Sequence, residues 1–168
     1  MRSAGLVLII VPCLLLCGCA RYQLGNGSEL PFEKIYIAPV RNDSVVPQMQ
    51  TVLSAQIRQK LLRHPRVKLA SNSEADVILT VTIVHFDQSV AATMSNDTVR
   101  AKSFTLNVRA ECSLFDSRTG EYLFRGHTVG ASIDSRVEGD YLRNKSQVIP
   151  QLSLKLAERI GNAVCNPW

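Results

Sequence analysis

Residues 103–115 read SFTLNVRAECSLF, and this stretch decides the fold because its apolar and polar side chains alternate without a break up to Leu114. A period of two places successive side chains on opposite faces of a β-strand. The pattern therefore predicts a strand, beginning near Val99, that covers a core on one side only. The apolar face comprises Phe104, Leu106, Val108, Ala110, Cys112 and Leu114, and the polar face comprises Thr105, Asn107, Arg109, Glu111 and Ser113.

Further strands are predicted on both sides of this stretch, where β-branched and aromatic residues are bounded by turn-forming ones. Residues 116–121 (DSRTGE) predict a hairpin between the long strand and the next one. Pro39 has no backbone N–H to donate, so the first strand should lie at an edge of the sheet or end near this residue. The additional strands are expected at residues 34–40, 66–70, 77–84 and 122–133.

Two segments change to the period of a helix. Apolar side chains recur about every four residues between Pro47 and His64 and again between Val148 and Ala163. Proline suits the first turn of a helix, where we place Pro47 and Pro150. The predicted buried positions are Met49, Leu53, Ile57 and Leu61 in the first helix and Val148, Leu152, Leu156, Ile160 and Ala163 in the second.

The order strand, helix, strands, helix predicts an α+β fold. Both helices are expected to be amphipathic and to pack on one face of a mostly antiparallel sheet of four to five strands. The other face of the sheet is then left polar and available for a partner.

The first residues resemble a lipoprotein leader. Arg2 precedes a short apolar run, and Leu16-Cys17-Gly18-Cys19 resembles the motif at which such leaders are cleaved and a cysteine is acylated. We expect a signal peptide over residues 1–18, a lipidated tether over 19–33 and one α+β domain over 34–168. Ala20, where Asp often signals inner-membrane retention, favours the outer membrane. The alternative is an ordinary secretory leader cleaved elsewhere.

Two further cysteines remain in the mature chain. Cys112 falls in the long strand and Cys165 follows the last helix. In an oxidising compartment they could form one disulfide that ties the tail to the sheet, or remain two buried thiols. The sequence leaves both alternatives open.

Motifs of enzyme chemistry are not found: the sequence has no glycine-rich phosphate loop, no His-Glu-x-x-His pair and no Cys-x-x-Cys in the mature chain. We therefore expect no reaction, no metal and no cofactor. The formal net charge is +5, but the basic residues are scattered and the chain is exported, so nucleic acid is not expected as a partner. Arg100, Lys102 and Arg136 could bind phosphates if a hairpin gathers them, or could simply maintain solubility.

The whole pattern resembles the lipopolysaccharide-assembly lipoprotein family, LptE. The resemblance lies in Cys19, in Tyr22-Gln23-Leu24, and in three later segments placed in the same order relative to the two helices. Arg21 replaces the glycine that usually precedes the tyrosine. The three later segments are residues 35–42 (IYIAPVRN), 74–79 (EADVIL) and 114–124 (LFDSRTGEYLF).

This resemblance implies a plug and assembly partner inside a β-barrel of the LptD type, which delivers lipopolysaccharide to the outer leaflet. It implies a polar domain surface suited to a hydrated lumen. Arg100, Lys102 and Arg136 are then the candidates for lipopolysaccharide contacts. Two other classes remain: a lipid-anchored adaptor of another envelope complex, and an enzyme whose site gathers His85, His127 and Asp134 in one pocket.

Overall fold

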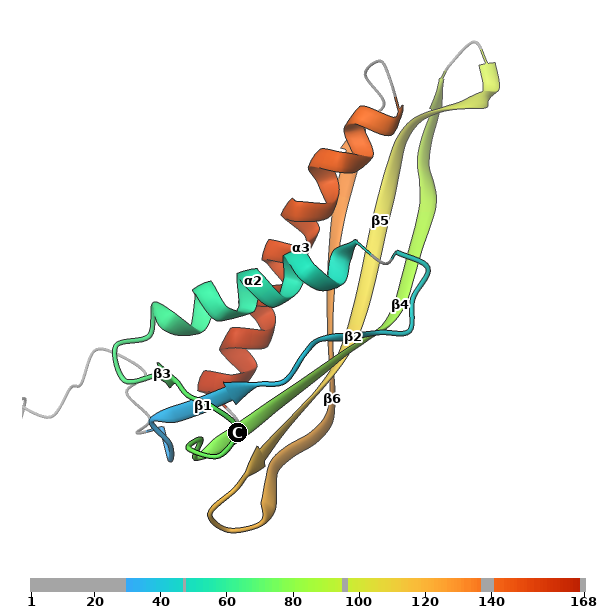
Figure 1. Ribbon diagram of the computed structural model, residues 1–168. Helices are drawn as coiled ribbons and strands as arrows, with labels where there is room; N and C mark the ends of the chain where they lie inside the picture. Colours follow the sequence, from blue (N-terminus) through green and yellow to red (C-terminus); the bar gives the residue numbers. More distant parts are fainter. Residues whose placement is uncertain (1–29, 47, 95–96, 137–140, 167–168) are drawn as a thin grey trace, which may run out of the picture.

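The computed structural model describes residues 30–46, 48–94, 97–136 and 141–166. Two helices and six strands form a mixed α+β structure in these ranges (Figure 1). In chain order the elements are β1 (Lys34–Ile37), β2 (Arg41–Asn42), α2 (Met49–Leu62), β3 (Lys68–Leu69), β4 (Val77–Met94), β5 (Asp97–Asp116), β6 (Glu121–Arg136) and α3 (Tyr141–Cys165).

The strands form one sheet in the order β3-β1-β4-β5-β6, with β2 also paired to β4. The sheet has six strands rather than four to five because β2, a pair of residues too short to show a period, was not predicted. The long strands β4, β5 and β6 pair antiparallel, which makes the sheet mostly antiparallel, whereas β1 pairs parallel with both β3 and β4.

Pro39 is accommodated by a break in the strand and not by an edge. β1 lies between β3 and β4 and ends at Ile37, and the chain pairs with β4 again only at β2. Ala38 still donates its N–H to the carbonyl of Leu79 at 3.0 Å. The missing N–H of Pro39 therefore falls where no ladder bond is required.

β4 is longer than predicted, and a register shift explains the difference. The apolar alternation stops at Val84, where we expected the strand to end. The pairing with β5 shifts between Ile83, opposite Ala110, and His85, opposite Arg109. One extra residue moves the side chains that follow to the other face, so Phe86 resumes the core side opposite Val108.

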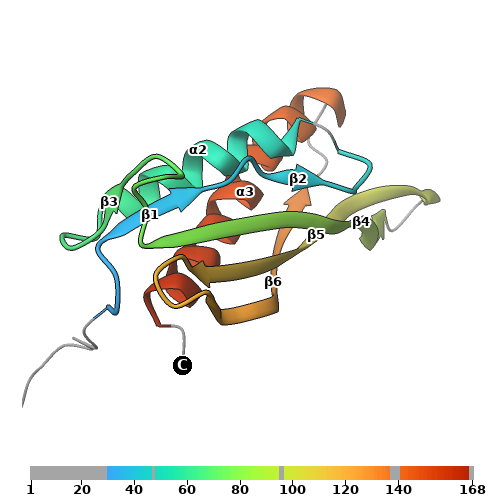
Figure 2. The ribbon, with the colours of Figure 1, turned by 60° about the horizontal axis from the view of Figure 1, so that its bottom comes forward.

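The core lies between the sheet and the helices. Figure 2 shows α2 and α3 on one side of the sheet, and α2 also packs against α3. The four predicted positions of α2 are fully buried. In α3, Val148, Leu152, Leu156 and Ile160 are buried as expected, but Ala163 is partly exposed and its place is taken by Val164.

Pro150 lies in the interior of α3, not in its first turn, because the helix already begins at Tyr141. The polar residues before Val148 carried no apolar period, which hid this first part of the helix. Proline cannot donate to the carbonyl four residues earlier. Pro150 itself is exposed. Nearby, the buried Ser153 donates its hydroxyl to the Ile149 carbonyl at 2.8 Å.

Candidate functional site

The candidate functional site is the face of the sheet that the helices leave uncovered. The polar side chains of β5 lie here, between polar residues of both neighbouring strands. Thr105 donates to Asp134 at 2.7 Å, and Asn107 donates to Asp87 at 3.1 Å. His85 Nε2 lies 3.1 Å from the other carboxylate oxygen of Asp87. These contacts give the middle of the face a hydrophilic, hydrogen-bonded surface.

A shallow depression of about 340 Å³ lies on this region of β5 and β6. Gly130, which has no side chain, lies between Arg109 and Arg159 in its lining. Arg159 reaches from α3 to donate to the Gly130 carbonyl, and Lys155 donates to the Ser132 carbonyl at 3.3 Å. Both bonds cover carbonyl groups on the free edge of β6, which limits pairing with a foreign strand.

A second cluster joins two segments singled out in the sequence, 74–79 and 114–124. Asp76 accepts hydrogen bonds from the backbone N–H groups of Glu33 and Lys34 at 3.0 and 2.9 Å. The buried Asp116 forms an ion pair with Arg118 at 3.0 Å, and Arg118 also donates to the Pro31 carbonyl at 2.6 Å. We call Asp76, Asp116 and Arg118 the entry clamp, because they hold the chain where it enters the domain.

Both carboxyl groups of the entry clamp have a lowered pKa. The backbone bonds from Lys34 and Glu33 lower the pKa of Asp76, and the side-chain bond from Arg118 lowers that of Asp116. A lowered folded-state pKa contributes stability that is present above the unfolded pKa and is lost as the pH falls through the folded value. The clamp should therefore stabilise the domain at neutral pH and weaken below about pH 4.

Asp76→Asn should lower the free energy of unfolding at pH 7 by about 1 kcal/mol, because a charged acceptor of two backbone bonds is replaced by a neutral one. The difference from the unsubstituted protein should shrink on acidification, which urea denaturation at several pH values measures. Asp43→Asn removes an exposed carboxylate outside the clamp and serves as the control. A pH-independent difference for Asp76→Asn would contradict this role.

The cations predicted from the sequence lie at the other end of the long strands. Arg136 pairs with Ser103, and Lys102 precedes Ser103 in β5, so the backbone brings Arg136 beside Lys102, with Arg100 further along the same strand. The side chains of these three residues lie outside the described part, as does Cys19. Lipidation and lipopolysaccharide contact therefore remain predictions.

The histidines do not form a site together. His85 is opposite Arg109 whereas His127 is opposite Cys112, so the two lie on either side of β5 and three residues apart along it, a separation of about 14 Å. Asp134 accepts a bond from Thr105 and not from a histidine. No group of three or more metal-binding side chains occurs within the described ranges.

Cys112 and Cys165 are free thiols in the structure, the first buried and the second partly buried. Burial, assisted by the charge of Glu111, raises the pKa of Cys112 to about 12, so this thiol stays protonated and unreactive at neutral pH. Alkylation of the folded protein at pH 7 should leave Cys112 unmodified. The protein is then unfolded without reductant and alkylated again. Modification of both Cys112 and Cys165 would agree with two free thiols, whereas modification of neither would indicate a disulfide between them.

The described chain is a small α+β domain with two helices on one side of a six-stranded sheet and a polar face left uncovered on the other. Residues 32–164 match the LptE family, described as lipopolysaccharide assembly, and the chain belongs to this family. The family is not one of enzymes. No curated protein matches the chain. Among the described residues, no helix has the length and apolar character needed to cross a bilayer.

Several solved structures share the fold. A minor lipoprotein from Acinetobacter baumannii has a TM-score of 0.55 at 12% identity, covering 81% of this chain and 95% of the other. Lipoprotein B from Nitrosomonas europaea has a TM-score of 0.51 at 18% identity, covering 80% of this chain and 81% of the other. A hypothetical protein from Chlamydia trachomatis has a TM-score of 0.54 at 13% identity, covering 80% of this chain and 99% of the other. At such identities the likeness concerns the fold alone.

Proposed function

We propose that this protein is an outer-membrane lipoprotein, acylated at Cys19, that acts as the plug and assembly partner of an LptD-type β-barrel. It helps the barrel to deliver lipopolysaccharide to the outer leaflet. Residues 1–18 serve as the signal peptide, 19–33 as the lipidated tether and 34–168 as the domain that enters the barrel. The observation that carries this proposal is the match to the LptE family over almost the whole domain.

The uncovered sheet face supports the proposal. The lumen of a large barrel is polar and hydrated, so a plug needs a wide surface rich in hydrogen-bonding groups. Ser89, Asn107, Arg109 and Asp134 present such groups across β4, β5 and β6. With α2 and α3 on the other side, this face can contact a partner without disturbing the core.

Affinity capture of the tagged, full-length protein from detergent-solubilised membranes tests the proposal. We expect a large outer-membrane barrel of the lipopolysaccharide-assembly type to co-purify in stable stoichiometry. Ser132→Arg and Thr128→Arg, which place bulky charges on the exposed part of β6, should reduce recovery of the barrel. Recovery of a different envelope complex would favour the lipid-anchored adaptor instead.

The triple variant Arg100→Ala, Lys102→Ala and Arg136→Ala tests the predicted lipopolysaccharide contacts. Exposed charge pairs contribute about 0.2–1 kcal/mol each, so the variant should bind lipopolysaccharide about tenfold more weakly. Its binding should also depend less on salt. A binding titration, with circular dichroism to confirm folding, measures both effects.

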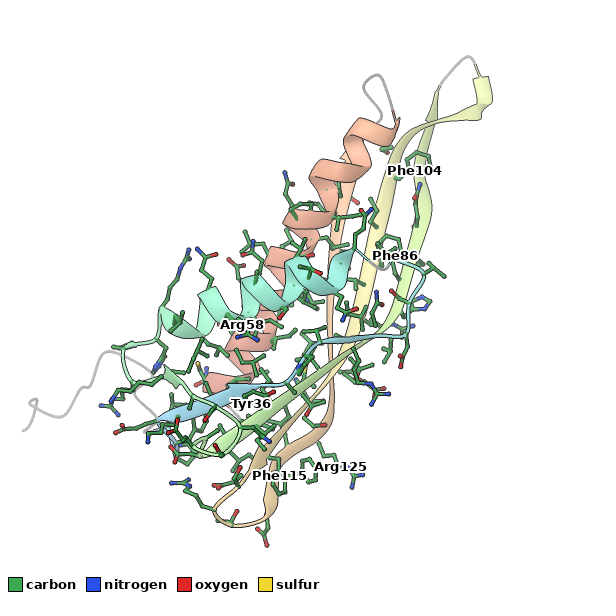
Figure 3. The ribbon with its side chains drawn as sticks, in the orientation of Figure 1. Tyr36, Arg58, Phe86, Phe104, Phe115 and Arg125 are labelled. Atoms are coloured by element: carbon green, nitrogen blue, oxygen red, sulfur yellow. The ribbon has the colours of Figure 1, made fainter. Side chains whose placement is uncertain are left out.

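The control removes the same charge elsewhere, through Arg58→Ala, Arg63→Ala and Arg66→Ala. These residues are exposed on or after α2, where Figure 3 labels Arg58. The control should bind as well as the unsubstituted protein. Equal weakening in both triple variants would show that net charge, not the end of the long strands, determines binding.

A further inference from the structure

An apolar row crosses four strands on the uncovered face of the sheet. Tyr36 pairs with Ile78, Ile78 pairs with Phe115, and Phe115 pairs with Tyr122. These four residues, which we call the aromatic row, therefore occupy one continuous line from β1 to β6. With adjacent strands about 4.8 Å apart, the row is about 14 Å wide.

The row faces away from the core. Its strand neighbours Ile35, Ile37, Val77, Leu79 and Leu114 are buried on the helix side. The first three members of the row are partly exposed, and Tyr122 is 49% exposed. The Phe115 and Tyr122 rings meet edge to face with centroids 5.2 Å apart.

Arg125 adds a charge to this apolar line. Its guanidinium lies 5.2 Å from the centroid of the Tyr122 ring. Figure 3 labels Arg125 and Phe115 together at the lower end of the long strands, with Tyr36 on β1. An aromatic surface bordered by a cation differs from the hydrogen-bonded middle of the same face. It has the amphipathic character of side chains at a membrane–water interface.

The aromatic row also lies at the end of the domain where the tether enters. Arg118, in the turn after Phe115, holds the Pro31 carbonyl. Tyr36 is two residues from the start of β1, a rise of about 7 Å. Cys19 precedes Leu30 by eleven residues, which span at most about 40 Å. The opposite end of β4 is about 60 Å away, so the greatest distance that an anchor on Cys19 allows between the row and the bilayer is much shorter than that of the far end.

We infer that the aromatic row lies against the interfacial layer of the bilayer that holds the acyl chains of Cys19. This inference rests on the proposed lipidation. The tyrosine rings bury their apolar bodies among the lipid while their hydroxyl groups stay at headgroup level. Arg125 reaches the lipid phosphates from the same line. The contact keeps the end of the domain where the tether enters at the membrane surface.

Quenching by brominated lipids tests the inference. Tyr122→Trp and, as the matched control, Ser132→Trp are prepared in the full-length protein carrying Trp168→Phe, so that each variant has a single tryptophan. Ser132 is exposed on the same strand and pairs with Asn107, eight residues from Phe115 along β5, or about 27 Å. Each purified, acylated protein is reconstituted into vesicles of brominated phosphatidylcholine and phosphatidylglycerol, after mass spectrometry has confirmed the acyl chains.

The Tyr122→Trp protein should lose most of its tryptophan emission in brominated vesicles relative to unbrominated ones, and the Ser132→Trp protein should keep its own. Adding Phe115→Ser and Tyr36→Ser to the Tyr122→Trp protein should reduce this quenching. If both variants are acylated and their tryptophans are quenched equally, or neither tryptophan is quenched, the inference is overturned while the anchor stays in place. Absence of acyl chains from the mass spectrum would instead overturn the proposed anchor, and the inference with it.

Discussion

Leu156→Ala is expected to lower the free energy of unfolding by about 2–5 kcal/mol, the range for removing a large aliphatic side chain from a close-packed core. Leu156 is fully buried in α3, the helix that packs against β5, β6 and α2. Its loss leaves a cavity at the junction of the two layers. Urea denaturation followed by circular dichroism measures the effect, which is large compared with the total stability of a domain of this size.

Leu154→Ala provides a matched control on the same helix. Leu154 is 41% exposed and lies two residues away, on the side of α3 turned toward solvent. The same chemical change there should cost much less than at Leu156, because little apolar area is withdrawn from water. Equal costs at both positions would show that helix propensity, and not burial against the sheet, governs the result.

Cys19→Ala should abolish incorporation of labelled palmitate and release the protein from the outer membrane. The leader motif predicts that the Cys19 thiol is the acylated attachment point, and several acyl chains are needed for stable anchoring. Metabolic labelling and membrane fractionation measure the two outcomes.

Cys17→Ala is the control for this experiment, because it removes a neighbouring thiol while leaving the small residue Gly18 and the cysteine at 19 in place. Labelling should continue. Persistent labelling of Cys19→Ala, or its loss in Cys17→Ala, would refute the assignment of the acylated residue.

The alternation of the strands and the four-residue period of the helices were sufficient to predict the principal elements. The strict pattern of residues 103–115 indicated the buried face of β5, and the four-residue repeat from Met49 to Leu61 indicated the buried side of α2. Each pattern arises from the side-chain directions of one element alone, so it can be read without knowledge of its neighbours. The hairpin at 116–121 followed from its turn-forming residues, which are likewise local in the sequence.

Features that depend on two distant segments were not predictable in this way. The entry clamp needs Asp76 beside Glu33 and Arg118 beside Pro31, and the aromatic row needs the register of four strands. The residues of the entry clamp and of the aromatic row lie in or next to segments 35–42, 74–79 and 114–124. These segments carry the family resemblance, but the sequence alone gives no physical reason for it. Their contacts now supply that reason. The shift after Ile83 hid the second half of β4, because it interrupts the alternation once.

The entry clamp also determines how a pull on the tether is carried by the domain. β1 pairs with β4 over three residues only and could be peeled away from its first residue. Tension arriving at Pro31 instead meets Arg118, which transfers it to Asp116 at the end of the twenty-residue strand β5. At Glu33 and Lys34 it meets Asp76, beside the start of β4. The load is thus shared with the longest strands in the sheet before the short first strand has to bear it.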